Sequence, residues 1–319
     1  MIINTGQRTD IPVFYAEWLI NRIREGFVMT RNPFNESRVT KYYLSPDYVD
    51  IINFCTKNPE PMLKYMDELK KYKQFWYVSI TPYGKEIEPN VPDKERVLEG
   101  FIKLSETVGI NSTGWRYDPI FINEIYTVEL HIREFEKMAK KLSGYTKICV
   151  ISFIDLYGKV LRNFPEVKPV PDRIKEELGK EFIKIAKNNG MTIYPCSEGK
   201  NLEKHGANCN GCMTAEIMET AIGEKLAIPK FKPAREGCAC YLSNDIGAYD
   251  TCGHFCKYCY ANSSIETVKR NMKLADVNSP LITGNLKEGD IIREAEKISY
   301  MDRQISFLNP KFNLKTLNP

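Results

Sequence analysis

Short apolar runs alternate with amphipathic patterns over the first 200 residues of the chain. The apolar runs are rich in Val, Ile and aromatic residues, which is typical of buried strands. We therefore predict seven strands, at residues 2–5, 27–30, 49–55, 75–80, 114–117, 148–154 and 192–194.

Between these runs, apolar residues recur at the spacing of one helix face. The first such pattern contains Phe14, Trp18 and Ile23, with Pro12 near its start and Gly26 just after its end, as helix ends prefer. Further helices are predicted at residues 61–71, 94–108, 126–142 and 171–189. The last two are densely charged, which indicates that they lie on the outside of the molecule.

Seven strand–helix units in series predict a parallel sheet with right-handed crossovers. The expected fold is α/β, a (β/α)8-like or partly open TIM-type barrel, with residues 240–242 as the candidate eighth strand. We divide the chain into a barrel core at residues 1–195, a cysteine-rich segment at residues 196–265 packed at the barrel mouth, and a C-terminal extension at residues 266–319.

Polar residues directly follow several of the predicted strands. Barrels of this kind carry function at the carboxyl ends of their strands, so these residues predict the rim of one pocket. A structural alternative exists for each, because strand-to-helix loops are polar in any case and Asp10 can simply cap the helix at Ile11-Pro12. The rim set comprises Arg8, Asp10, Arg31, Asn32, Lys57, Asn58, Arg116, Tyr117 and Asp118.

Charge and composition narrow the partner classes. The net charge of the 319 residues is +4, with 45 basic and 41 acidic side chains, which is too mild to indicate nucleic acid by itself. No stretch approaches the roughly 18 apolar residues of a membrane helix, and the N-terminus lacks a secretory signal. We expect a cytoplasmic protein with no membrane partner.

The ten cysteines are the unusual feature, because eight of them fall between residues 196 and 259. Disulfides are rare in the cytoplasm, so this crowding predicts metal binding. Cys55 and Cys149 lie inside apolar strands and are expected to be buried small hydrophobic residues.

The most specific motif is Cys252-Gly-His-Phe-Cys256-Lys-Tyr-Cys259. Three thiolates this close in sequence can hold one face of a four-iron cluster and leave one iron without a protein ligand. The alternative is a zinc site, but zinc sites usually carry paired C-x2-C units. The spacing therefore favours an iron–sulfur cluster.

This motif, with an aromatic residue before its third cysteine, resembles the signature of radical S-adenosylmethionine (SAM) enzymes. The resemblance implies a [4Fe–4S] cluster held by Cys252, Cys256 and Cys259, with Tyr258 at the aromatic position, and a SAM molecule on the open iron that is cleaved to a 5′-deoxyadenosyl radical. Residues 256–260 also resemble the cluster loop of spore photoproduct lyase. The motif departs from the usual pattern because it lies near the C-terminus, and no Gly-Gly-Glu motif is evident.

The whole chain also resembles an uncharacterised prokaryotic family of unknown function with a C-terminal radical-SAM-like cysteine cluster. The resemblance covers most of residues 1–265. It is carried by residues 8–12, 31–34, 56–59, 115–119, 238–240, 245–249 and 259–262.

Five further cysteines precede the motif, and the spacings Cys209-x2-Cys212 and Cys238-x-Cys240 are typical of metal chelation. They predict a second [4Fe–4S] cluster, a structural zinc site or unligated thiols. The family resemblance assigns the ligands to Cys196, Cys212, Cys238 and Cys240, which leaves Cys209 spare.

The leading functional expectation is an enzyme that reductively cleaves SAM and starts radical chemistry on a small anionic substrate, supplied with electrons by a donor such as ferredoxin or flavodoxin. The alternatives are an iron–sulfur protein that transfers electrons or senses redox state, and a nucleic-acid repair enzyme of the photoproduct-lyase type. The candidate catalytic residues are Arg8, Asp10, Arg116, Tyr117 and Asp118, and the candidate cofactor contacts are Tyr258, Arg31, Asn32, Lys57 and Asn58. In this hypothesis the basic residues bind anionic groups, the two aspartates hold ribose hydroxyls or orient the arginines, and Tyr117 relays a radical or donates a hydrogen bond.

Overall fold

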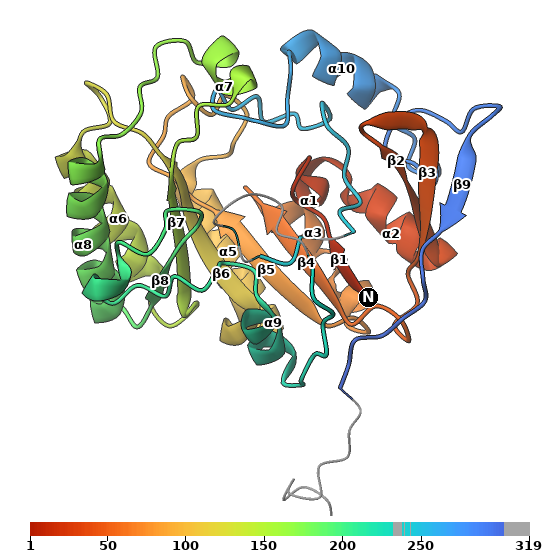
Figure 1. The fold of residues 1–319 in the computed structure, drawn as a ribbon, viewed down its shortest axis with the longest axis horizontal. Helices are drawn as coiled ribbons and strands as arrows, with labels where there is room; N and C mark the ends of the chain where they lie inside the picture. Colours follow the sequence, from red (N-terminus) through yellow and green to blue (C-terminus); the bar gives the residue numbers. More distant parts are fainter. Residues whose placement is uncertain (232–237, 239, 243, 303–319) are drawn as a thin grey trace, which may run out of the picture.

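The computed structural model describes residues 1–231, 238, 240–242 and 244–302 (Figure 1). Its centre is a six-stranded sheet in which every neighbouring pair is parallel, in the order β1-β4-β5-β6-β7-β8. The strands are β1 (Ile2–Asn4), β4 (Ile51–Thr56), β5 (Gln74–Ser79), β6 (Thr113–Ile120), β7 (Ile148–Phe153) and β8 (Thr192–Pro195). Six of the seven predicted strands are thereby confirmed as members of a parallel sheet.

Helices connect these strands. The predicted helix at residues 94–108 is confirmed at both ends, and those at 126–142 and 171–189 begin and end within two residues of their prediction. The helix expected at 61–71 is two short helices. The helices are α1 (Ile11–Phe14), α2 (Ala16–Glu25), α3 (Glu60–Leu63), α4 (Met66–Leu69), α5 (Lys94–Val108), α6 (Val128–Leu142), α7 (Gly158–Asn163), α8 (Asp172–Asn188), α9 (Ala215–Ile222) and α10 (Ile265–Lys273), with 3-10 turns at η1 (Ile110–Ser112) and η2 (Glu203–His205).

The alternation of side chains along the strands gives the sheet two different faces. Ile52 and Trp76 belong to the core that packs against the long helices. Their neighbours Ile51 and Phe75 belong to a second core on the opposite face, which is covered by α9 and the cysteine-rich chain around it. In Figure 1, α9 lies on the opposite side of the sheet from α6 and α8. We call this opposite side the thiol face.

The sheet is open, so the expectation of a closed barrel is not confirmed. Among the described strands, β1 and β8 are the two edges. The candidate eighth strand at residues 240–242 is irregular where it is described. Instead, the free edge of β1 is covered by residues 244–246, through Asn4 N–H to the Asn244 carbonyl (3.1 Å) and Ile246 N–H to the Asn4 carbonyl (2.9 Å). This cover occupies the backbone groups that a closing strand would need.

The prediction that residues 27–30 form a strand of the parallel sheet was wrong. They belong to β2 (Phe27–Asn32), which pairs antiparallel with β3 (Asn35–Tyr43) in a separate three-stranded sheet completed by β9 (Ile291–Glu294). The side chain of Asn32 accepts hydrogen bonds from the backbone of Phe34 (2.8 Å) and Asn35 (3.2 Å). This turn reverses the chain where a crossover helix was expected.

None of the described helices has the length and apolar character that a bilayer crossing needs.

Candidate functional site

The three cysteines of the motif lie in a loop at residues 250–262, which we call the cysteine loop. It packs where β1, β4 and β5 end. Tyr260 donates to the Gln7 carbonyl (2.6 Å) after β1, and Lys257 N–H donates to the Ile87 carbonyl (3.0 Å) after β5. The loop therefore sits at the carboxyl edge of the sheet, where parallel sheets place their sites.

Asp10 connects the loop to two strand ends. Its buried carboxylate accepts from the Thr56 hydroxyl (2.7 Å), from Lys57 N–H (2.7 Å) and from Nε2 of His254 (2.9 Å). It also caps α1 by accepting from Val13 N–H (3.2 Å). The structural role predicted for Asp10 is thus confirmed, and the same carboxylate also positions the cysteine loop.

Glu88 is a second buried carboxylate in the site, and sequence reasoning missed it. It accepts from Lys57 Nζ (2.9 Å), from the Thr81 hydroxyl (2.7 Å) and from the Tyr258 hydroxyl. Burial raises its pKa, but the Lys57 ammonium and the hydrogen bonds from Tyr258 and Thr81 together outweigh burial and hold the pKa below the usual range. Glu88 had no signal in the sequence, because it lies in a turn after β5 with no motif around it.

Side chains outside the motif fix the backbone of the cysteine loop. Asn90 donates from its amide to the Gly253 carbonyl (2.7 Å) and from its backbone to the His254 carbonyl (3.2 Å). Asn262 donates to the Cys252 carbonyl (2.8 Å). Phe255 has a φ of 56°, a left-handed conformation that costs energy in a non-glycine residue. The loop is therefore held in a conformation that its own sequence does not favour.

The three thiols lie within electrostatic reach of one another. Burial raises the pKa of Cys252 and of Cys259, and Asp10 raises that of Cys252 further. Burial also raises the pKa of Cys256, opposed by the Lys57 ammonium. Unliganded, these thiols are protonated at neutral pH, so a metal would have to displace their protons.

Two buried polar atoms of the cysteine loop, Nδ1 of His254 and Oδ1 of Asn262, have no hydrogen-bond partner in the part of the chain that the structure describes. Unsatisfied buried polar atoms are rare and costly in folded proteins. Their presence beside three thiols is the arrangement expected where a bound group supplies the missing contacts.

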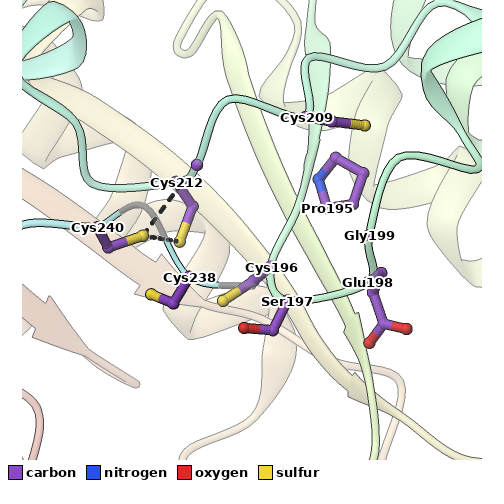
Figure 2. A pocket seen from close by; sticks show the side chains of 10 residues that line it. Pro195, Cys196, Ser197, Glu198, Gly199, Cys209, Cys212, Cys238 and Cys240 are labelled. Atoms are coloured by element: carbon purple, nitrogen blue, oxygen red, sulfur yellow. Dashed lines mark hydrogen bonds between the residues drawn. The ribbon is translucent and has the colours of Figure 1, made fainter. Parts of the chain in front are cut away.

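A second group of thiols lines a small pocket on the thiol face (Figure 2). The Sγ atoms of Cys212 and Cys240 are 3.3 Å apart, and Cys212 N–H donates to Cys240 Sγ (3.3 Å). Figure 2 shows the sulfurs of Cys196 and Cys238 beside this pair, while the sulfur of Cys209 points away. We call Cys196, Cys212, Cys238 and Cys240 the thiol pocket.

Arg116 contacts the thiol pocket from β6. Its guanidinium donates to Cys212 Sγ (3.7 Å), pairs with Asp118 (2.6 Å) and lies over the Tyr77 ring (5.3 Å). A further thiol, Cys55 of β4, has a pKa that burial raises to about 11. The charges of Arg116, Asp118, Asp10 and Lys57 also act on this thiol.

Within the described ranges, no three His, Cys, Asp or Glu side chains converge closely enough to hold a single metal ion. Tetrahedral thiolates around one zinc ion would have their sulfurs about 3.8 Å apart, given a Zn–S bond of about 2.3 Å. Neither group of thiols is therefore arranged around a single metal ion.

The structure separates some of the predicted rim residues from these sites. Tyr117 points into the helix-covered core, where its hydroxyl contacts Nδ1 of His131 (2.8 Å). Arg31 lies in the three-stranded sheet and pairs with Asp290 (2.6 Å), and Asn32 forms the adjacent turn. We place none of these three side chains in the site.

Two further rim residues have local structural partners. Arg8 donates to the Gly247 carbonyl (3.3 Å) and lies 3.8 Å from Asp245. These two contacts hold the chain that leads into the cysteine loop. Asn58 accepts from Glu60 N–H (3.1 Å) at the start of α3. Arg8 therefore borders the site, whereas Asn58 serves the helix.

A cavity of about 410 Å³ opens beside β5, next to the cysteine loop. Glu88 lines it, together with Thr81 at the strand end, and so stands between the cavity and Tyr258. Its volume is in the range that small ligands occupy. The other lining residues are Ser79, Ile80, Tyr83, Gly84, Lys85, Val91, Pro92, Asp93, Lys94, Glu95 and Val97.

Comparison with protein families gives one assignment. Residues 2–261 match the family described as a domain of unknown function (DUF1848), which spans the sheet and both thiol groups. A search of curated proteins finds no match to this chain. The chain therefore belongs to the DUF1848 family, and its chemistry has to be argued from its own residues.

Proposed function

We propose that this protein, a member of a family of unknown function, is an iron–sulfur enzyme of the radical SAM type. The observation that carries the proposal is the cysteine loop. It brings three thiols together at the carboxyl edge of a parallel sheet, next to two unpartnered polar atoms. Three thiols, and not four, are what a cluster with one open iron requires.

Cys252, Cys256 and Cys259 would hold a [4Fe–4S] cluster. Thiolates bound to different irons of such a cluster stand farther apart than ligands of one ion, which agrees with the absence of a single-ion arrangement among the described residues. When bound, the cluster would supply one electron to the sulfonium of SAM. The chain's own contribution is to hold the loop, exclude water and orient the substrate.

Asp10 and Glu88 are the positioning residues of this proposal. Asp10 fixes His254 and Glu88 fixes Tyr258, so each carboxylate holds one side chain of the motif. Lys57 lies between them, with its backbone bonded to Asp10 and its ammonium to Glu88. Partners of this kind orient metal ligands and tune the metal they bind.

The substrate class is less constrained than the sequence suggested. Lys57, Arg116 and Arg31 pair with Glu88, Asp118 and Asp290, and Arg8 lies near Asp245, so these cations are not free to select an anion. The same pairing gives no support to the nucleic-acid repair alternative. We propose that a small molecule enters the cavity beside β5, where the lining residue Glu88 contacts Tyr258 of the motif.

The test is an anaerobic activity assay of the full chain. The protein is reconstituted with iron and sulfide, reduced, mixed with SAM, and assayed for 5′-deoxyadenosine. We expect product from the natural sequence and from Cys209→Ser, and none from Cys256→Ser. An intact cluster that forms no product, with an electron paramagnetic resonance spectrum that SAM leaves unchanged, would refute the proposal.

One observation favours an alternative, an iron–sulfur protein without an open iron. Nδ1 of His254 is buried in the loop without a partner, so it could serve as a fourth ligand. Pulsed electron paramagnetic resonance distinguishes the two. Hyperfine coupling to a histidine nitrogen that disappears in His254→Ala supports the alternative, whereas coupling to the SAM amino nitrogen supports the enzyme.

A further inference from the structure

We propose that the thiol pocket binds a second iron–sulfur cluster, of the [4Fe–4S] class, with all four of its irons held by the protein. The pocket is separate from the cysteine loop, so this inference does not depend on SAM chemistry at Cys252, Cys256 and Cys259. Its ligands are Cys196, Cys212, Cys238 and Cys240.

Hydrogen bonds fix two chain segments of the pocket on the sheet and tie the third segment to the second. Cys196 follows β8, and its N–H donates to the Ile151 carbonyl (2.8 Å) in β7. The carbonyl of Cys212 accepts from the Tyr77 hydroxyl in β5. Tyr241, next to Cys240, donates from its N–H to the Met213 carbonyl (2.8 Å). The thiols are thus presented by a rigid support, as metal sites require.

Two sulfurs of the thiol pocket accept hydrogen bonds. Cys240 Sγ accepts from the Cys212 N–H, and Cys212 Sγ accepts from the Arg116 guanidinium. Donors of this kind stabilise the negative charge of a cluster with four thiolate ligands and tune its reduction potential.

Ser197 lines the same pocket and is held in an unfavourable state. Its φ is 59°, a left-handed conformation, and its buried Oγ has no hydrogen-bond partner among the described residues. Two costs at one residue indicate that a bound group offsets them. A cluster sulfide is an acceptor that this hydroxyl could reach.

The two simpler readings of four thiols do not suit the geometry. A zinc ion would draw at least three sulfurs into one tetrahedron, and the described thiols do not converge in that way. A disulfide has an S–S distance of about 2.05 Å, whereas the sulfurs of Cys212 and Cys240 are 3.3 Å apart and the described cysteines form no disulfide. The four thiols line one pocket, which is the number of thiolates that a [4Fe–4S] cluster takes, and the sulfurs of Cys212 and Cys240 would separate to reach different irons.

The experiment measures iron, sulfide and zinc in three variants of the full chain, reconstituted anaerobically with iron and sulfide. Cys252→Ser/Cys256→Ser removes the first site and keeps the thiol pocket. Cys212→Ser/Cys238→Ser does the reverse, and Cys209→Ser is the matched control from the same segment. We expect each double variant to hold about half the iron of the natural sequence, and the control to hold all of it.

Mössbauer spectroscopy of Cys252→Ser/Cys256→Ser supplies the readout that does not depend on the other variant folding. A four-iron spectrum with uniform thiolate ligation, unchanged by SAM, supports the second cluster. Stoichiometric zinc in that protein as purified, or a Cys212–Cys240 disulfide found by mass spectrometry of the reconstituted protein, would overturn it. Loss of SAM cleavage alone would count against the proposed function and leave the second cluster standing.

Discussion

At the scale of single residues, Glu88 is the side chain on which the site depends most directly. It is 4 % exposed and carries the only carboxylate that Lys57 Nζ is seen to contact among the described residues. Removing one partner of a buried ion pair leaves the other charge uncompensated, which costs far more than an exposed pair is worth.

We expect Glu88→Gln to lower the free energy of unfolding by about 3 kcal/mol, because Lys57 then stays buried without a counter-charge. Urea unfolding followed by circular dichroism measures the change. Glu60→Gln is the matched control, because its partner Arg96 is exposed and the pair should contribute little. Equal stability of the two variants would show that Glu88 does not carry a buried charge pair.

His131 gives a pH-dependent prediction away from both thiol groups. Burial lowers its pKa to about 4, from about 6.5 in the unfolded chain. The unfolded state therefore takes up a proton first as pH falls, and the folded state loses about 3 kcal/mol of stability between pH 6.5 and pH 4. His131→Gln should flatten this part of the stability profile, whereas His205→Gln, beside Glu176, should leave it in place.

The sequence located both thiol groups and, beside them, Asp10, Lys57 and Arg116, but it missed Glu88 and grouped Tyr117 with the pocket rim. The position of Tyr117 follows from the strand pattern. In β6, Arg116 contacts the thiol pocket, so alternation alone places its neighbour Tyr117 on the helix side. Glu88 could not be found in this way, because a turn residue has no periodicity and its partners are distant in sequence.

At the scale of elements, hydrogen bonds from several parts of the chain hold the cysteine loop, and Asp10 makes the one to Nε2 of His254. An asparagine in its place would present a donor where the aspartate accepts, and two of its four contacts would be lost or inverted. The sheet itself does not depend on this side chain, since its strands pair through backbone bonds.

We expect Asp10→Asn to release cluster iron to a chelator about tenfold faster, because residues that orient metal ligands typically affect affinity on this scale. Asp172→Asn, at the exposed start of α8, is the control and should release iron at the natural rate. Absorbance of the chelated iron measures both. Equal release rates would show that the carboxylate does not hold the loop closed.

Element types were predicted better than their connections. The helix at Lys94–Val108 follows from its apolar spacing alone. The hairpin of β2 and β3 was missed because β3 is mostly polar and has only one buried residue, so it carries no strand signal. By itself, β2 looks like one more parallel strand. An apolar run predicts that a strand is present, but it does not predict which strand that one pairs with.

At the scale of the whole molecule, the thiol face joins the early and late parts of the chain in one core. Ile2, Ile51 and Phe75 from the sheet pack with Ile217 of α9 and with Cys240. The boundary we predicted at residue 195 thus falls at the end of β8, with apolar surface of the sheet buried by the chain beyond it.

We expect a chain cut after residue 195 to aggregate, because the thiol face would expose a large contiguous apolar patch. Sedimentation after expression measures this. In the full chain, Ile217→Asp places a charge in the same core and should lower the melting temperature, whereas Thr220→Asp on the exposed side of α9 should not. A soluble, folded 1–195 fragment would show that the face does not need its cover.

The position of both thiol groups after β8 also sets an order for biosynthesis. Every strand of the parallel sheet precedes Cys196 in the sequence and therefore emerges from the ribosome before Cys196 does. Cys259, the last cysteine of the cysteine loop, follows Cys196 by 63 residues. The growing chain must therefore keep the uncovered face of its sheet from other proteins until the cysteines arrive. Loading of the metal centres that we propose then becomes the last step of maturation, so a shortage of iron would accumulate chains that are fully synthesised but incompletely covered.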